Sequence, residues 1–167
     1  MVLPIVIIPS PILRAPTKAV DKSLLKSRGI QSLIDDMLET MPAAQGIGLA
    51  APQVNSVYRI AVVACGTKPY VVVNPSIVSA GSVMKESEEG CLSIPGVNGM
   101  VPRYAEVKVA ALDRQGRRLN IRAGGLLGFV FQHEIDHLDG ILFVDKVSRF
   151  LTSVTEEQKK IFAAHKK

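Results

Sequence analysis

The sequence has little cysteine, no tryptophan and no long hydrophobic run. No apolar stretch reaches the roughly 18 residues that a membrane-spanning helix needs, so we expect no membrane partner. The two cysteines allow at most one disulfide, and no other feature suggests secretion. Residues 2–8 are apolar, but this run is too short for a signal-peptide core and no cationic segment precedes it. We therefore expect a cytoplasmic protein without a signal or transit peptide.

The net charge and the chain length say little about binding partners but indicate the number of domains. The formal net charge of +5 permits a weak attraction to nucleic acid or another anionic surface. Scattered Lys and Arg side chains more often form only a hydrated surface, and we expect no recognition of a specific nucleic-acid sequence. The 167 residues are enough for one domain with its own core, and no repeat or linker divides them. The prediction is a single domain over residues 1–167.

Hydrophobic periodicity and turn residues predict the order of the helices and strands. The expected elements are a helix at 30–41, a hairpin of 59–64 and 70–73, strands at 77–84, 105–112 and 117–122, a helix at about 126–139, and a short helix at about 155–166. Strands fill most of the first two thirds, and one mostly apolar helix follows them. This order favours an α+β fold, with antiparallel or mixed sheets packed around a central helix, over alternating βαβ units.

The central helix contains the pattern His-Glu-x-x-His at 133–137. Positions four apart lie on the same face of a helix, so His133 and His137 present two imidazoles side by side. Glu134 is rotated by about 100° from His133, which lets it reach a water beside a metal without being a ligand. The alternative is a pair of histidines matched with acids on a solvated face. The apolar flanking run disfavours that alternative, because buried polar groups need a partner such as a metal.

Two histidines leave a hydrolytic metal site one protein ligand short. The candidates for this third ligand are Cys91 or a carboxylate such as Glu88, Glu89 or Asp145. Thiolates bind transition metals tightly, which favours Cys91. This preference rests on ligand chemistry, because the spacing alone does not decide it.

Three motifs together resemble the signature of the peptide deformylase family. They are GIGLAAPQ at 46–53, EGCLS at 89–93 and QHEIDH at 132–137, in the family's order. Each is weak alone, since the first could be an ordinary loop that enters a strand. The likeness extends over about residues 5–147, and the last thirty or so residues are the least characteristic.

The resemblance implies removal of the N-formyl group from the initiator methionine of nascent chains. It assigns the metal to Cys91, His133 and His137, and the catalytic roles to Glu134, Gln53 and Leu92. The family's usual metal is Fe²⁺, for which Zn²⁺, Ni²⁺ or Co²⁺ can substitute. A metal makes water a usable nucleophile near neutral pH, Glu134 would act as the general base for attack on the formyl carbon, and the Gln53 amide and the Leu92 N–H would stabilise the oxyanion.

The resemblance also implies a peptide site beside the metal. Its expected residues are Ile47, Gly48, Gly90, Phe129 and Val130. The substrate backbone should pair with the edge at 47–48, as a strand added to a sheet. Leu126 could line the methionine pocket or pack in the core. Asn98 stands where many bacterial relatives carry an arginine, so a clamp at that position is in doubt.

Two other functions, and the roles of Asp136 and of the C-terminal tail, remain open at this point. A zinc endopeptidase would cleave internal peptide bonds without needing a formyl group, and a metal-stabilised binding module would need no base. Asp136 could orient a ligand histidine or form an ion pair with Arg103. The basic C-terminal tail, with Lys159, Lys160, Lys166 and Lys167, could dock on the ribosome surface or simply be a solvated helix end.

Overall fold

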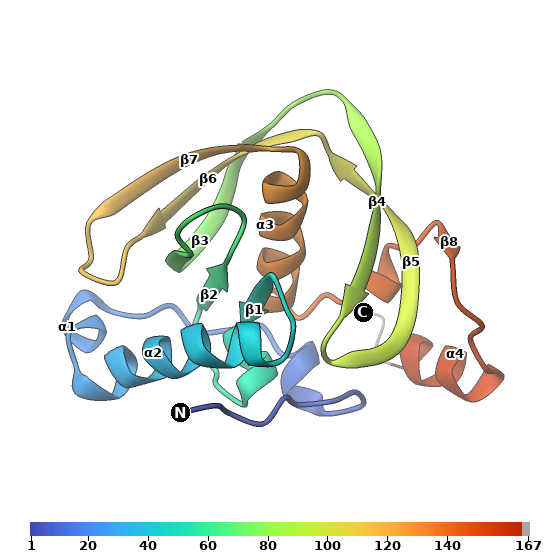
Figure 1. Ribbon diagram of the computed structural model, residues 1–167, viewed down its shortest axis with the longest axis horizontal. Helices are drawn as coiled ribbons and strands as arrows, with labels where there is room; N and C mark the ends of the chain where they lie inside the picture. The colour runs from blue at the N-terminus through green and yellow to red at the C-terminus, as the bar shows by residue number, and fades with distance from the viewer. Residues whose placement is uncertain (165–167) are drawn as a thin grey trace.

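Two antiparallel sheets flank one buried helix in the computed structural model, which describes residues 1–164 (Figure 1). The helices are η1 (Pro11–Arg14), α1 (Lys22–Leu25), α2 (Arg28–Ala43), η2 (Ala51–Val54), α3 (Gly125–Leu138), η3 (Phe143–Asp145) and α4 (Glu156–Ala163). The strands are β1 (Gly48–Ala50), β2 (Ile60–Val63), β3 (Tyr70–Ala80), β4 (Met84–Cys91), β5 (Ile94–Tyr104), β6 (Glu106–Leu112), β7 (Arg118–Gly124) and β8 (Arg149–Phe150). This arrangement confirms the predicted α+β class.

The larger sheet has the strand order β1-β2-β3-β6-β7, and the smaller has β4-β5-β8. Every neighbouring pair is antiparallel, so the mixed alternative falls away. The predicted hairpin appears as β2 and β3, with Ile60 opposite Val73. The predicted pair at 105–112 and 117–122 appears as β6 and β7, joined by a turn in which the N–H of Gly116 donates to the carbonyl of Asp113.

The strand predicted at 77–84 is present only in part, and its bounds are wrong. Residues up to Ala80 continue β3, and Met84 already belongs to β4. Asn74 adopts a left-handed conformation with φ of 53°, and the register against β6 shifts at this point. Its side chain exchanges two hydrogen bonds with the backbone of Val20, which compensates for the interrupted ladder. The chain therefore bends at Asn74 and stays in the same strand through Pro75.

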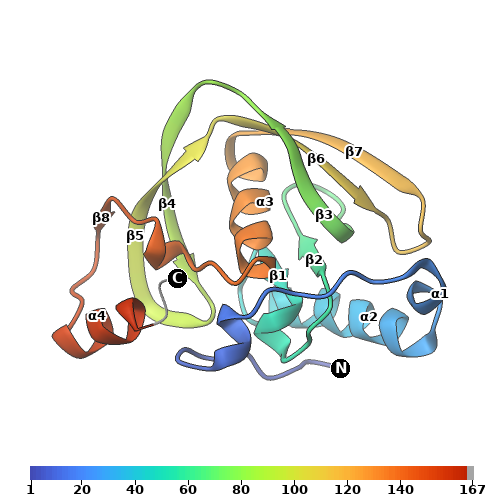
Figure 2. The ribbon, with the colours of Figure 1, turned by 180° about the vertical axis from the view of Figure 1, so that it is seen from behind.

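Helix α3 lies in the middle of the molecule in both views (Figures 1 and 2). It contacts strands of both sheets, and Phe131, Ile135 and Leu138 are buried against the larger one. Gly124 is its N-cap, and Gly140, with φ of 76°, follows its last turn. The prediction of a buried helix over 126–139 is therefore confirmed to within one residue at each end.

Helix α2 covers the end of the larger sheet near β1 and β2. The Ser27 hydroxyl accepts a hydrogen bond from the N–H of Ile30, which satisfies a free donor of the first turn. Ile30, Ile34 and Met37 then bury their side chains against the sheet, as their helical spacing predicts.

The C-terminal helix α4 packs beside the smaller sheet, at the end of the molecule opposite α2 (Figure 2). Its capping box is present, since Thr155 and Gln158 exchange backbone-to-side-chain hydrogen bonds. Phe162 is buried against the same core as Leu13. The helix ends at Ala163, and the predicted continuation to 166 lies outside the described residues, as do Lys166 and Lys167. Within residues 1–164, no helix has the length and hydrophobicity to cross a bilayer.

Candidate active site

Strands β4 and β5 form a hairpin that carries Cys91 to its tip. The register pairs Gly90 with Asn98 and then shifts, so that Cys91 pairs with Ile94. The two residues between them, Leu92 and Ser93, make the turn. The hairpin tip lies against the C-terminal half of α3, so a thiol from one sheet approaches the helix that packs on the other.

Cys91, His133 and His137 come together although they are separated in the sequence. Their ligand atoms all lie within 4.8 Å of one another, and Cys91 Sγ is 3.2 Å from His137 Nε2. The two imidazole rings are 4.9 Å apart between centroids, as the spacing on a helix predicts. One thiol and two imidazoles suit a transition metal. These side chains can hold a single metal ion.

The other candidates for a third ligand are engaged elsewhere or point outward. Glu88 is exposed at the rim of the site. Asp145 forms an ion pair with Arg14 and accepts a hydrogen bond from the N–H of Leu142. Glu89 binds Arg103 and His133. The geometry therefore favours Cys91, in agreement with its ligand chemistry.

Glu134 is buried beside this cluster with one carboxylate oxygen unpaired. Its Oε2 has no hydrogen-bond partner among residues 1–164. Burial raises the pKa of Glu134 to about 7, because removal from water disfavours the charged carboxylate. An unpaired buried oxygen costs free energy unless a water or ligand reaches it. The donor set and this free oxygen together fit a metal ion with an adjacent base.

The histidines differ in their electrostatic surroundings. Burial lowers the pKa of His137 well below its usual value, and the neighbouring His133 adds to this shift. Burial alone would also lower the pKa of His133, but its hydrogen bonds to Cys91 and Glu89 raise it well above the usual value. His133 is thus the histidine with a carboxylate partner, whereas Nδ1 of His137 is buried without one among the described residues.

Gly48 in β1 makes the room that Glu134 occupies. A Cβ at this position would overlap the Glu134 carboxylate and crowd the side chain of Val130. The second glycine of the first motif is therefore explained by this close approach.

Gln53 points its amide nitrogen toward the cluster. Nε2 is 3.6 Å from Cys91 Sγ and 3.3 Å from Ser93 Oγ, while Oε1 accepts a hydrogen bond from the N–H of Ala50. The last contact fixes which end of the amide faces the site. Gln53 is buried, so this donor is held in place before any ligand arrives.

A pocket of about 450 Å³ opens beside the cluster. The residues predicted from the sequence that line it are Ile47, Gly48, Gln53, Gly90, Cys91, Leu92, Phe129, Val130, His133 and Glu134. His137 lies behind them, buried. Leu126 also lines the pocket and is 60% exposed, so it is a rim residue and not part of the core. None of the described lining residues is a lysine or an arginine, and Asn98 lies over Gly90 as a neutral side chain.

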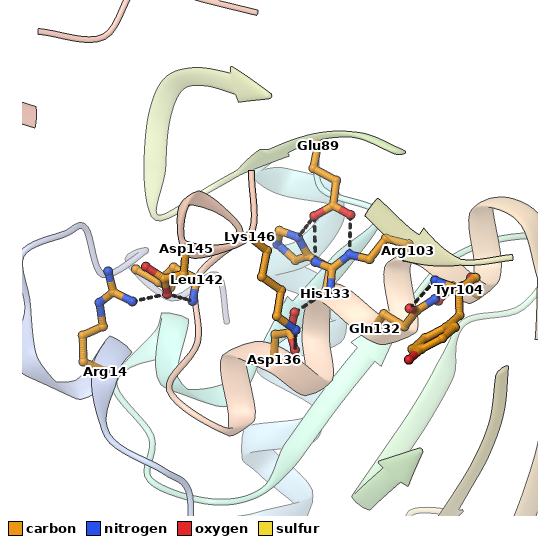
Figure 3. A network of polar contacts seen from close by, with 11 residues as sticks. Arg14, Glu89, Arg103, Tyr104, Gln132, His133, Asp136, Leu142, Asp145 and Lys146 are labelled. Atoms are coloured by element: carbon orange, nitrogen blue, oxygen red, sulfur yellow. Dashed lines mark hydrogen bonds and ion pairs between the residues drawn. The ribbon is translucent and has the colours of Figure 1, made fainter. Parts of the chain in front are cut away.

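A network of charged side chains connects His133 with Glu89, Arg103, Asp136 and Lys146 (Figure 3). Arg103 binds Glu89 through two nitrogens and Asp136 through the third, and Lys146 binds the other oxygen of Asp136. Glu89 in turn contacts His133. Of the two roles considered for Asp136, the structure thus shows the ion pair with Arg103, and Glu89 is the carboxylate that meets a histidine. Sequence reasoning missed this, although alternate positions on a strand place Glu89 on the same face as Cys91.

A sequence model of the family described as Polypeptide deformylase matches residues 2–152 of the chain. The chain belongs to this family. The peptide deformylase of Symbiobacterium thermophilum is 48% identical over 159 residues, which cover 93% of this chain and 71% of the relative. That of Acetivibrio thermocellus is 47% identical over 149 residues, which cover 89% of this chain and 85% of the relative.

Solved deformylase structures share the fold. The actinonin-bound class I type b peptide deformylase from Acinetobacter baumannii has a TM-score of 0.84 at 40% identity, covering 89% of this chain and 99% of that chain. The same enzyme bound to Met-Ala-Ser has a TM-score of 0.85 at 37% identity, covering 88% and 99%. The chain is accordingly an enzyme, a metal-dependent hydrolase that removes the formyl group from an N-terminal formylmethionine.

Proposed function

We propose that Cys91, His133 and His137 hold the metal in this deformylase and that Glu134 is its general acid and base. The observation that carries the proposal is the buried Glu134 carboxylate, whose unpaired oxygen lies beside the three ligand side chains. A site that only stabilised the fold would be closed and would need no such group.

When bound, the metal ion supplies Lewis-acid chemistry, which makes water acidic and polarises the formyl carbonyl. Glu134 takes a proton from the attacking water as the water oxygen bonds to the formyl carbon. The carbonyl electrons move to the formyl oxygen, where the Gln53 amide and the Leu92 N–H donate hydrogen bonds. Glu134 then returns the proton to the amine nitrogen as the C–N bond breaks. Formate and a free amino terminus result.

The peptide would bind along β1, with its methionine in the pocket. β1 is an edge strand of the larger sheet, and Ile47 and Gly48 line the pocket where this strand begins. Phe129 and Val130 form an apolar wall, and Gly90 leaves space opposite. The Met-Ala-Ser bound relative supports this assignment, because its ligand is a peptide that starts with methionine.

We further propose that the native metal is Fe²⁺, with Zn²⁺, Ni²⁺ or Co²⁺ able to replace it. A thiolate with two imidazoles accepts all four ions, so the donor set alone does not choose among them. Purification without oxygen, followed by elemental analysis and activity measurement, tests the assignment. A preparation that is fully active with zinc and contains no iron would contradict it.

The substrate suggests where the enzyme works. Formylmethionyl chains emerge during synthesis, so we propose that the chain acts in the cytoplasm as one catalytic domain over residues 1–167. Lys159 and Lys160 in α4, with Lys166 and Lys167 beyond the described residues, would dock on the ribosome surface. Replacing all four with glutamine should lower the amount of enzyme that co-sediments with ribosomes and leave the turnover of short peptides unchanged. If the variant and the wild type co-sediment equally, the docking proposal is wrong.

The decisive experiment measures formate release from formyl-Met peptides. We expect release to need the metal, and Glu134→Ala to lower it by about 10²–10⁴-fold while metal binding persists. Substantial activity in Glu134→Ala would show that the base is misassigned. Cleavage of unformylated peptides at internal bonds would instead indicate an endopeptidase.

A further inference from the structure

Arg103 is a buried arginine whose three guanidinium nitrogens all donate hydrogen bonds to carboxylates. Nε and Nη2 donate to the two oxygens of Glu89 at 2.7 and 2.9 Å, and Nη1 donates to Asp136 at 2.5 Å. The side chain is 3% exposed. Placing a charge in such a position is costly unless its geometry does something a simpler side chain could not.

The fork of Arg103 decides how Glu89 meets His133. Glu89 Oε2 accepts from Arg103 and also lies 2.8 Å from His133 Nδ1. A carboxylate held by arginine stays ionised and can only accept, so His133 Nδ1 carries the proton. The other ring nitrogen, Nε2, is left for the cluster with Cys91 and His137.

The far end of Arg103 is held just as firmly. Asp136 accepts from Arg103 with one oxygen and from Lys146 with the other, so two cations face two carboxylates. Gln132 binds both the N–H and the carbonyl of Tyr104, which fixes the strand next to Arg103 against α3 (Figure 3). The arginine is thereby set in place relative to the helix that carries His133.

We propose that Arg103 is a positioning residue for the metal ligand His133 and acts through Glu89. The inference rests on the proposed function, in which His133 binds the metal. It adds that the orientation and tautomer of this ligand are set by a residue of β5 that does not touch the metal.

Arg103→Lys tests this because it keeps the charge and removes the fork. A lysine ammonium is a point charge and cannot hold both Glu89 oxygens and Asp136 in one plane. We expect Zn²⁺, measured by competition with a chelator, to bind about 10-fold more weakly, as when the partners of metal ligands are changed. In ¹⁵N spectra of histidine-labelled protein, the His133 Nδ1 proton should exchange faster with water.

Arg114→Lys is the matched control. Arg114 also donates from Nε to a side-chain oxygen, that of Gln31, and binds a carboxylate, that of Asp35, but these contacts lie between α2 and the β6–β7 turn. Its Zn²⁺ affinity and ring-proton exchange should match those of the wild type. An equal loss in both variants would overturn the proposal, since the effect would then be general to arginine loss.

The outcomes separate the two hypotheses. If wild-type protein binds no Zn²⁺ through Cys91, His133 and His137, the proposed function fails and the positioning role fails with it. If the wild type binds but Arg103→Lys binds equally well with unchanged exchange, only the positioning role fails. Should Arg103→Lys not fold, Asp136→Asn releases just one contact of Arg103, and it must still show weaker binding and faster exchange of the His133 proton. Unchanged exchange there overturns the proposal.

Discussion

Helix α3 carries two kinds of buried polar group that differ in how fully they are paired. Asp136 has a partner for each oxygen, Arg103 and Lys146, and His133 has Glu89. By contrast, Glu134 Oε2 and His137 Nδ1 have none within the described chain. All four residues lie within two turns of the same helix. Both residues with an unpaired atom are ones that we assign to the chemistry, whereas Asp136, whose two oxygens are paired, is not. His133, a proposed metal ligand, uses Nδ1 for its contact with Glu89.

Glu89, the partner of His133, and Glu134 contribute to stability in opposite ways as the pH changes. Burial would raise the pKa of Glu89, but hydrogen bonds from Arg103 and His133 lower it to about 2. Burial raises the pKa of Glu134 to about 7. Relative to an ordinary value of 4.5, Glu89 stabilises the fold above pH 4.5 and loses this contribution as the pH falls toward 2. Glu134 stabilises the fold at low pH and loses this contribution as the pH rises toward 7, because between pH 4.5 and 7 it holds a proton in the folded protein that it has lost in the unfolded chain.

The largest expected effect comes from Arg103→Met. It would leave the buried Glu89 without its arginine and Asp136 with Lys146 as its remaining ion-pair partner, and breaking such a buried pair costs roughly 3–5 kcal/mol. Urea unfolding at pH 7 measures this loss. If Arg103→Met were as stable as the wild type, the network behind the ligands would contribute nothing to the fold, and the contrast with the unpaired set would lose its meaning.

Gly48→Ala should act on catalysis more than on stability. The new methyl group would displace the Glu134 carboxylate, and misplacement by about 1 Å can cost about 10²-fold in rate. Steady-state formate release measures kcat. Gly29→Ala in α2 is the control, because a Cβ there meets nothing within 4 Å. It should leave kcat unchanged and add about 0.5–1 kcal/mol of stability. Equal kcat in both variants would contradict the close packing of Glu134.

Glu134→Gln should remove a pH dependence from the metal-free protein. Between pH 4.5 and 7 the folded wild type binds more protons than the unfolded chain, so its stability falls as the pH rises through this window. The Gln variant lacks this term. Unfolding at pH 5 and pH 8 in the presence of a chelator should show a wild-type loss greater by on the order of 1–2 kcal/mol. Parallel pH profiles would mean that Glu134 titrates normally.

Lys146→Met should have the smallest effect. Its ammonium group binds Asp136, but the side chain is 40% exposed and the pair is screened by water. We expect a loss below about 1 kcal/mol that shrinks further in high salt. A loss as large as that of Arg103→Met would show that the two cations contribute as one unit.

The sequence predicts the parts of the site that depend on local spacing. His133, Glu134 and His137 follow from helical geometry, and the capping box at Thr155 from its own residues. Cys91 follows from ligand chemistry and the family likeness, because nothing local ties it to α3. The contacts of Glu89 and Arg103 require the register of β4 and β5 and the way this hairpin packs on α3. Neither is encoded in a short pattern, so the network beyond the Asp136–Arg103 pair, which the sequence offers as one alternative, was not predictable.

The strand at 77–84 failed for a related reason. Local propensity alone gives no sign that one strand runs from Tyr70 to Ala80. The side chain of Asn74 bonds to a backbone segment more than fifty residues earlier, at Val20. A long-range contact of this kind outweighs the local signal.

The metal-binding thiol lies at the tip of the smaller sheet, whereas both imidazoles lie on a helix packed against the larger one. An ion held by all three would therefore link the smaller sheet to the helix and larger sheet. Chelation should speed amide hydrogen exchange in β4 and β5 far more than in β2 and β3. The enzyme's resistance to mechanical or thermal opening along this seam would then vary with its metal content.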